Sequence, residues 1–164
     1  MLVEGYHLEK KMENFIQQHF IGVWHHFLYF EINRSNFAVQ TFGSANAYLI
    51  FQVIAWHHIL VMMDQAEAKV RKEAVELWFK LTETGFKTRT VLTYSLISSM
   101  TSLSIETIRR QVKKLEKNNW VTYSKKEGVK FSPSEENNKF LANVFNVKEV
   151  RDLGRFLDVI EKQK

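Results

Sequence analysis

The sequence predicts a mainly α fold that contains one small β-hairpin. Apolar residues recur at steps of three and four through most of the chain, which is the period of an α-helix. Residues 120–132 alternate instead, around a Lys-Lys-Glu-Gly stretch, a pattern typical of two short strands and a turn. Pro133 is the only proline and no Ser/Gly-rich linker occurs, so the elements are expected to pack together.

Three helices are expected in the first half of the chain. The apolar periodicity that predicts them covers residues 8–32, 44–65 and 68–83. Residues 33–43 are expected to connect the first two helices. Ser44 can cap the second helix, because its hydroxyl can accept a backbone N–H that the first turn leaves unpaired. Gly85 is expected to end the third helix.

The second of these helices could belong to a protein core or to a membrane. No charged side chain lies between Arg34 and Asp64, and residues 48–63 are almost wholly apolar. Gln52 and two histidines interrupt this run, which is shorter than the roughly 20 residues that a bilayer core requires. We therefore expect a helix buried in a core or a subunit interface, and no membrane partner.

Several functional classes find no support in the composition. The chain has no cysteine, which excludes disulfides, Cys-based zinc sites and thiol catalysis and agrees with a cytoplasmic protein. The first residues lack the basic start and apolar run of a signal peptide. The sequence contains no Gly-rich phosphate loop, no His-Glu-x-x-His and no Gly-x-Ser-x-Gly. We expect a cytoplasmic protein that is not an enzyme and that holds no cofactor or metal.

Two helices joined by a tight turn are expected between Thr93 and Asn118. Thr93 and Ser104 stand where their hydroxyls can cap helices over residues 94–100 and 105–118. In the second helix a narrow apolar stripe faces inward. The opposite face and its flanks carry polar and basic residues, namely Glu106, Thr107, Arg109, Arg110, Gln111, Lys113 and Lys114. Arg and Gln side chains can read base edges in a major groove, while Lys and Thr can hold phosphates.

A basic hairpin is expected directly after this helix. Strands over residues 120–124 and 129–132 flank the Lys-Lys-Glu-Gly turn, in which Gly128 can supply a positive φ. Residues 87–130 hold ten basic and three acidic residues, a local net charge of +7, whereas the whole chain carries +5. Positive charge concentrated in one segment is typical of a segment that meets a polyanion.

Two further helices are expected at the C-terminal end. Ser134 can cap the first of them, which is expected to run to about residue 145. The last helix is expected over residues 147–164, with Val150, Leu153 and Leu157 among the apolar residues on one side.

The segment from Leu92 to Val121 resembles the winged helix-turn-helix regulators. Bacterial MarR-, GntR- and CRP-type regulators share a Ser-x-x-Thr-hydrophobic-x-Arg core, followed by a Leu-Glu pair and the first wing strand. Here Ser104-Ile105-Glu106-Thr107-Ile108-Arg109-Arg110 matches that core, with Leu115-Glu116 and Trp120-Val121 behind it. The resemblance covers about a quarter of the chain. Asn119 stands where a glycine is usual, and the first helix of the motif lacks its common alanine.

The helical flanks make the chain most similar to the MarR type, since a CRP-type protein would bring a β-rich N-terminal domain. About ninety residues precede the motif, more than the MarR family usually has. The resemblance implies a homodimer that binds double-stranded DNA through a winged helix-turn-helix. It divides the chain into a helical dimerisation and effector region (1–86), a DNA-binding region (87–132) and C-terminal dimerisation helices (133–164).

The resemblance also implies roles for individual side chains. Thr107, Arg110 and Gln111 would read bases, and Arg109, Lys113, Lys114, Lys125 and Lys126 would hold phosphates, beside the cap residue Ser104. A protein-interaction module with the same fold stays open as an alternative, since fold alone does not determine the partner.

Two similar Trp-His pairs lie in the expected N-terminal helices. Trp24-His25 and Trp56-His57 could surround a small aromatic effector, because apolar pockets with a few polar groups bind such molecules. A ligand or metal sensor acting through these residues is a further alternative. Adjacent histidines on a helix point about 100° apart, so they do not easily ligate one ion. Core or interface histidines are therefore the favoured interpretation.

Overall fold

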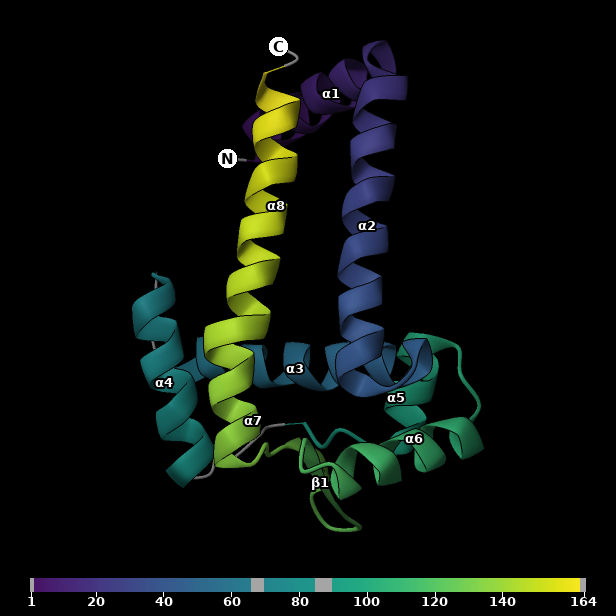
Figure 1. Cartoon of the computed structure of the whole chain (residues 1–164), viewed down its shortest axis with the longest axis vertical. Helices are drawn as coiled ribbons and strands as arrows, with labels where there is room; N and C mark the ends of the chain where they lie inside the picture. Colours follow the sequence, from purple (N-terminus) through teal and green to yellow (C-terminus); the bar gives the residue numbers. More distant parts are fainter. Residues whose placement is uncertain (1, 66–69, 85–89, 163–164) are drawn as a thin grey trace. The chain divides into compact units, whose positions relative to one another are not determined.

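The computed structural model describes residues 2–65, 70–84 and 90–162, and the side chains of all of these except residues 2–9 and 65. The chain is mainly helical, as predicted, and the strands of its described part form one antiparallel hairpin (Figure 1). The elements are α1 (Leu2–Gln18), α2 (Phe20–Phe42), α3 (Ala45–Gln65), α4 (Arg71–Thr84), α5 (Tyr94–Thr101), α6 (Ile105–Lys117), β1 (Val121–Ser124), β2 (Gly128–Phe131), α7 (Glu135–Phe140), a π-helical stretch η1 (Leu141–Phe145) and α8 (Asn146–Glu161).

The chain forms two compact units. Unit 1 consists of residues 1–37 and 147–164, and unit 2 of residues 38–146. This division differs from the three segments expected from the sequence (1–86, 87–132 and 133–164). Helices α3 and α4 fall in unit 2 together with α5, α6 and the hairpin, because α3 contacts all four of these elements.

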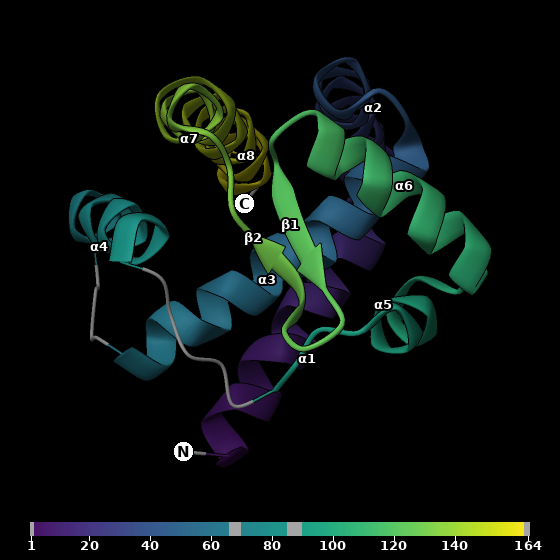
Figure 2. The ribbon, with the colours of Figure 1, turned by 90° about the horizontal axis from the view of Figure 1, so that it is seen from below.

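Helix α3 lies at the centre of unit 2. It contacts α4, α5, α6 and β2, and Figure 2 shows it crossing behind the hairpin. Ile50 and Ile54 of α3 are fully buried, as are Ile97 of α5 and Ile108 of α6. Over Ala45–Asp64 this helix is long and apolar enough to cross a membrane, but half of that window is already buried against the protein. These contacts are those of a core helix, in agreement with the sequence.

An aromatic cluster joins elements of unit 2 that are far apart in the sequence. The Phe42 ring lies 4.2 Å from that of Phe51, 5.1 Å from that of Trp120 and 5.5 Å from that of Phe145. The Phe51 ring also lies 6.0 Å from that of Phe131. Buried aromatic pairs of this kind stabilise a fold by about 0.5–1.5 kcal/mol each beyond their buried area.

Unit 1 is held together by contacts between α2 and α8, which run side by side (Figure 1). The Phe156 ring stacks on Phe30 at 5.7 Å and tilts against Phe27 at 6.0 Å. Further along the same pair of helices, Arg34 Nε donates a hydrogen bond of 3.0 Å to Glu149 Oε1.

The predicted helix boundaries in the N-terminal half were partly wrong. Two helices that meet at His19 replace the single helix predicted over residues 8–32. The predicted connection over residues 33–43 is instead helical to Phe42, where packing keeps Ala38 and Phe42 buried at helical spacing. Gly43 then ends the helix with φ +85°.

The Ser44 cap was predicted correctly, because the Ala47 N–H donates to the Ser44 Oγ at 3.1 Å. The third helix begins at Arg71; the expected start at residue 68 and the expected stop at Gly85 lie outside the described residues. The break predicted after Phe145 was wrong, since η1 continues without interruption into α8. The Ser134 cap was correct: its Oγ accepts the Asn137 N–H at 3.3 Å.

His58 makes the stability of unit 2 depend on pH. Its side chain is 3% exposed and packs on the Phe131 ring at 4.7 Å. Burial, and secondarily the charge of His57, lowers the pKa of His58 from 6.5 to about 4. The unfolded chain therefore binds a proton between pH 6.5 and pH 4 that the folded chain excludes. We expect the free energy of unfolding to be highest above pH 6.5 and to fall by about 3 kcal/mol by pH 4.

Urea unfolding followed by circular dichroism between pH 6.5 and pH 4 measures this effect. His58→Phe should remove most of the pH dependence, whereas His25→Gln, at an exposed histidine of unit 1, should keep it. An unchanged pH dependence in His58→Phe would contradict the role of this residue.

Gly128 and Gly43 form a matched pair for testing how the hairpin is anchored. Both adopt positive φ, +69° and +85°, and both belong to unit 2. A Cβ on Gly128 would lie 2.5 Å from the Leu92 carbonyl oxygen, whereas a Cβ on Gly43 would meet nothing within 4 Å.

Gly43→Ala should therefore lower the free energy of unfolding by about 1–2 kcal/mol, because of the left-handed backbone alone. Gly128→Ala should cost at least about 2 kcal/mol more, because the Leu92 backbone must move. Equal losses in urea titrations would show that the close approach is unimportant.

Candidate nucleic-acid interface

Helices α5 and α6 begin at the two hydroxyl caps that the sequence predicted. Thr93 Oγ1 accepts the Leu96 N–H at 3.1 Å, and Ser104 Oγ accepts the Thr107 N–H at 3.2 Å. Each bond satisfies a donor that the first turn of a helix leaves without a partner, and a cap of this kind is worth about 1 kcal/mol. The start of each helix is thus determined by its own local sequence.

The turn between these helices is fixed by short-range hydrogen bonds. Ser102 adopts the left-handed conformation with φ 57°, and its N–H donates to the Ser98 carbonyl at 2.9 Å. The Ser98 hydroxyl donates to the Leu103 carbonyl at 2.6 Å. The left-handed residue ends α5 and the side-chain bond holds the turn closed, so α6 leaves in a defined direction.

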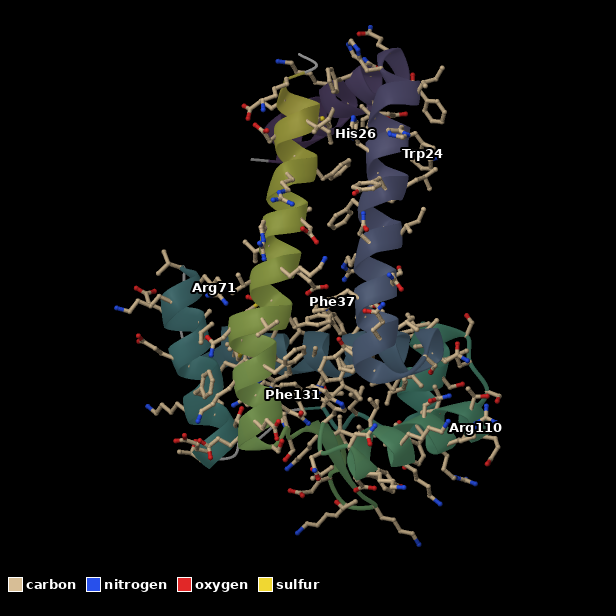
Figure 3. The ribbon with its side chains drawn as sticks, in the orientation of Figure 1. Trp24, His26, Phe37, Arg71, Arg110 and Phe131 are labelled. Carbon is tan, nitrogen blue, oxygen red and sulfur yellow. The ribbon has the colours of Figure 1, made fainter. Side chains whose placement is uncertain are left out.

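Helix α6 has a buried side and a charged side. Ile108, Val112 and Leu115 are buried against unit 2, as their helical spacing predicted. The opposite side carries exposed basic side chains, and Figure 3 shows Arg110 pointing outward from α6. This outer side and the hairpin turn lie on the same side of unit 2, away from α3 (Figure 1).

The expectation that Gln111 lies on the outer face is wrong. Its side chain is 5% exposed, and the Ser44 hydroxyl at the start of α3 donates to its Oε1 at 3.5 Å. The spacing contained the signal for this result, because position 111 lies three residues after Ile108 and four before Leu115. A helix places such positions on one face. Gln111 therefore contacts α3 and is not available to a ligand on the outer side.

The remaining expected residues lie on α6 and at the hairpin turn, and we call this set the α6–hairpin surface. It comprises Thr107, Arg109, Arg110, Lys113, Lys114, Lys125 and Lys126. Ser104 stands at its edge, where its hydroxyl also donates to Thr107 Oγ1 at 3.0 Å. Among the side chains that the structure describes, none pairs with Arg110, Lys113 or Lys114. Lys87 and Arg89, which contributed to the local charge of +7, lie outside the described residues.

Two carboxylates lower the effective charge of this region. Arg109 Nη1 donates to Glu106 Oε2 at 3.0 Å, and Lys130 Nζ donates to Glu127 Oε1 at 2.7 Å. The hydrogen bond and the positive charge of Lys130 hold the pKa of Glu127 below its usual range. Glu127 is therefore ionised and neutralises Lys130, while Lys125 and Lys126 at the turn remain exposed. The charge available to a ligand is concentrated on α6 and at the tip of the hairpin.

The outer edge of each strand of the hairpin is hydrogen-bonded to another part of the chain. On β2, the Val129 N–H donates to the Leu92 carbonyl at 2.8 Å. On β1, the Tyr123 N–H donates to Glu116 Oε1 of α6 at 3.1 Å. Val129 and Tyr123 face each other across the hairpin. The hairpin is thus positioned by the segment before α5 and by α6 itself.

Three residues of this arrangement have contacts that the sequence did not predict. Tyr94 and Tyr123 stack with ring centroids 4.4 Å apart, which joins α5 to β1, and burial raises the pKa of Tyr94. Glu116 accepts the bond from β1 described above. Asn119, which stands where a glycine is usual, adopts φ 57° between α6 and β1, a conformation that Asn tolerates better than most residues.

The two Trp-His pairs do not form one site within either unit. Trp24 and His25 belong to unit 1, whereas Trp56 and His57 belong to unit 2. Trp24 stacks on Phe20 at 5.5 Å, and the His57 ring nitrogen lies 3.0 Å from the Thr90 carbonyl oxygen. Within residues 2–65, 70–84 and 90–162 no group of three or more His, Asp or Glu side chains is arranged to hold a metal ion. The shared effector site remains a prediction.

A scan against protein-family models matches none of them, and searches of curated proteins and of solved structures find no match. The features that bear on function are therefore the chemistry of the α6–hairpin surface and of unit 1.

Proposed function

We propose that this chain is a sequence-specific regulator of transcription that binds double-stranded DNA through a winged helix-turn-helix formed by α5, α6, β1 and β2. One observation carries the proposal: α6 is anchored by its buried side while its outer side and the hairpin tip present exposed cations on one side of unit 2. An α-helix of this kind fits the major groove, and a basic hairpin can follow the adjacent backbone.

The side chains of this surface divide into two roles. Arg110, which points outward and has no partner among the described side chains, can donate two hydrogen bonds to the guanine edge. Thr107, near the start of α6, is the second base-reading candidate. The phosphate contacts fall to Arg109, Lys113, Lys114, Lys125 and Lys126. Gln111 has no role in DNA contact, because it is buried.

The proposal includes a homodimer. Exposed apolar side chains follow one face of α8 (Val150, Leu153 and Leu157) and the side of α2 that carries Ile21, Leu28 and Ile32. Ile21 is 85% exposed and Leu157 54%, and Figure 3 shows Trp24 on the side of α2 away from α8. Exposed apolar faces of this kind are typical of protein–protein interaction sites. A second copy of the chain would bury these apolar faces. It would also supply the second winged helix-turn-helix that a pseudo-palindromic site, with half-sites about 34 Å apart, requires.

The proposed regulator resembles the MarR type in having helical segments before and after the winged helix-turn-helix in the sequence. We propose a cytoplasmic location for it, in agreement with the use of α3 as a core helix rather than a membrane span. The proposed activity is binding and involves no catalytic step.

Selection from random duplex DNA, followed by titration of the selected and of random sequences, tests DNA binding by the α6–hairpin surface. Arg110→Ala should weaken binding to the selected sequence by about tenfold or more and binding to random DNA much less, because one bidentate base contact is worth about 1–3 kcal/mol. Lys125→Ala should weaken both equally and reduce the slope of log affinity against log salt by about one.

Lys72→Ala is the matched control, because it removes one exposed lysine of α4 in the same unit but outside the α6–hairpin surface. Its affinities should equal those of the unmodified protein. If the unmodified protein binds no duplex at low salt but captures a protein partner with salt-insensitive affinity, the interaction-module alternative replaces this proposal.

Sedimentation velocity tests the homodimer. Leu153→Glu should convert the dimer to a monomer, because it places a charge in the apolar face of α8 that the second copy would bury. Val70→Glu changes an exposed apolar residue of unit 2 outside both faces and should leave the dimer intact. A monomeric unmodified protein, or a dimeric Leu153→Glu protein, would refute the dimer.

A further inference from the structure

A cavity of about 430 Å³ lies within unit 1, between α2 and α8. Its lining comes from facing sides of the two helices, with His26, Tyr29 and Phe30 on α2 and Arg151, Arg155 and Phe156 on α8 among the residues that form it. Figure 3 shows His26 on the side of α2 that faces α8. The volume falls in the range of small-molecule sites, roughly 300–1,000 Å³. None of the four Trp-His residues singled out in the sequence lines this cavity.

One part of the cavity is aromatic. The rings of Phe30 and Phe156 are stacked 5.7 Å apart with an angle of 12° between their planes. Tyr29 lines the same cavity and is 66% exposed, so its ring is available from solvent. An aromatic ring of a ligand gains apolar burial and offset stacking on such a surface.

The other part of the cavity is cationic. Arg151 and Arg155 lie four residues apart on α8 and therefore on one face of the helix. Within the described part of the chain neither guanidinium has a hydrogen-bond or ion-pair partner. Lys148, in contrast, pairs with Asp152 and lies over the Phe37 ring at 5.1 Å from its centroid. Asp152 is thus occupied by Lys148, which leaves two guanidinium groups for an anion.

We infer that this cavity binds a small aromatic anion, a one- or two-ring molecule that carries a carboxylate or a phosphate group. Its ring would lie against Phe30, Phe156 and Tyr29. Its anionic oxygens would accept hydrogen bonds from Arg151 and Arg155, whose planar forks match both groups. The inference does not depend on DNA binding, because every lining residue belongs to unit 1 and none to the α6–hairpin surface.

Isothermal titration calorimetry with the full chain tests this site with four probes. 1-Naphthoate and 1-naphthyl phosphate carry both recognition elements and distinguish a carboxylate from a phosphate ligand. 1-Naphthamide retains the rings without the charge, and inorganic phosphate retains the charge without the rings. At least one of the first two should bind at millimolar concentration or below, about fivefold or more tightly than either of the last two, since exposed charge-assisted bonds contribute modestly.

The double variant Arg151→Gln/Arg155→Gln should reduce that affinity by about fivefold or more and remove its dependence on salt. Lys11→Gln, which removes an exposed charge of unit 1 outside the cavity, should not change it. Circular dichroism should show both variants folded.

Three results would overturn the inference: no binding of either naphthyl anion, equal binding of 1-naphthamide, or unchanged affinity in a folded double variant. Titration of the double variant with duplex DNA keeps the two proposals separate. It should bind DNA as the unmodified protein does. If the chain binds the naphthyl anion but no DNA, the proposed DNA-binding function is refuted and the proposed ligand site in unit 1 is still supported.

Discussion

The structure of unit 2 depends on the burial of α3. This helix has almost no charge along its length, so it cannot remain in water without cost, and each fully buried Ile or Leu contributes about 1.5–3 kcal/mol to stability. Its side chains Ile50 and Ile54 complete a core whose other members come from α5, α6 and β2. Because α6 packs its apolar stripe and Gln111 toward this helix, its basic side necessarily faces outward. The proposed reader surface is therefore a consequence of what α6 buries.

The local signals in the sequence were sufficient to predict the elements of this surface. The caps at Thr93 and Ser104, the positive φ of Gly128 and the tolerance of Asn119 each depend on bonds within a few residues. The extension of α2 to Phe42 could not be predicted in the same way. It accompanies contacts such as Arg34 with Glu149, 115 residues apart in the chain, which no short-range pattern reveals. The position of Gln111 lies between these cases, because the helical period alone places it inward.

The same distinction between local signals and long-range contacts applies to the candidate sites. The sequence identified which residues of α6 and the hairpin are basic, but not that Glu106 and Glu127 form ion pairs with Arg109 and Lys130. Both pairs span three residues, so their formation depends on the local rotamers of the four side chains. The cavity in unit 1 was not foreseen at all, since it exists only where α2 and α8 face each other. From the sequence alone, Arg151 and Arg155 can be identified only as charged residues of a helix.

The bonds on the two outer edges of the hairpin have a consequence for solubility. A two-stranded sheet normally leaves backbone N–H groups pointing outward, and such edges recruit strands from other molecules into aggregates. Here the outward N–H of Val129 is occupied by the Leu92 carbonyl, and that of Tyr123 by Glu116. At this pair of residues neither edge offers a donor to an incoming strand. At these two positions the hairpin therefore meets other molecules without an unpaired backbone donor.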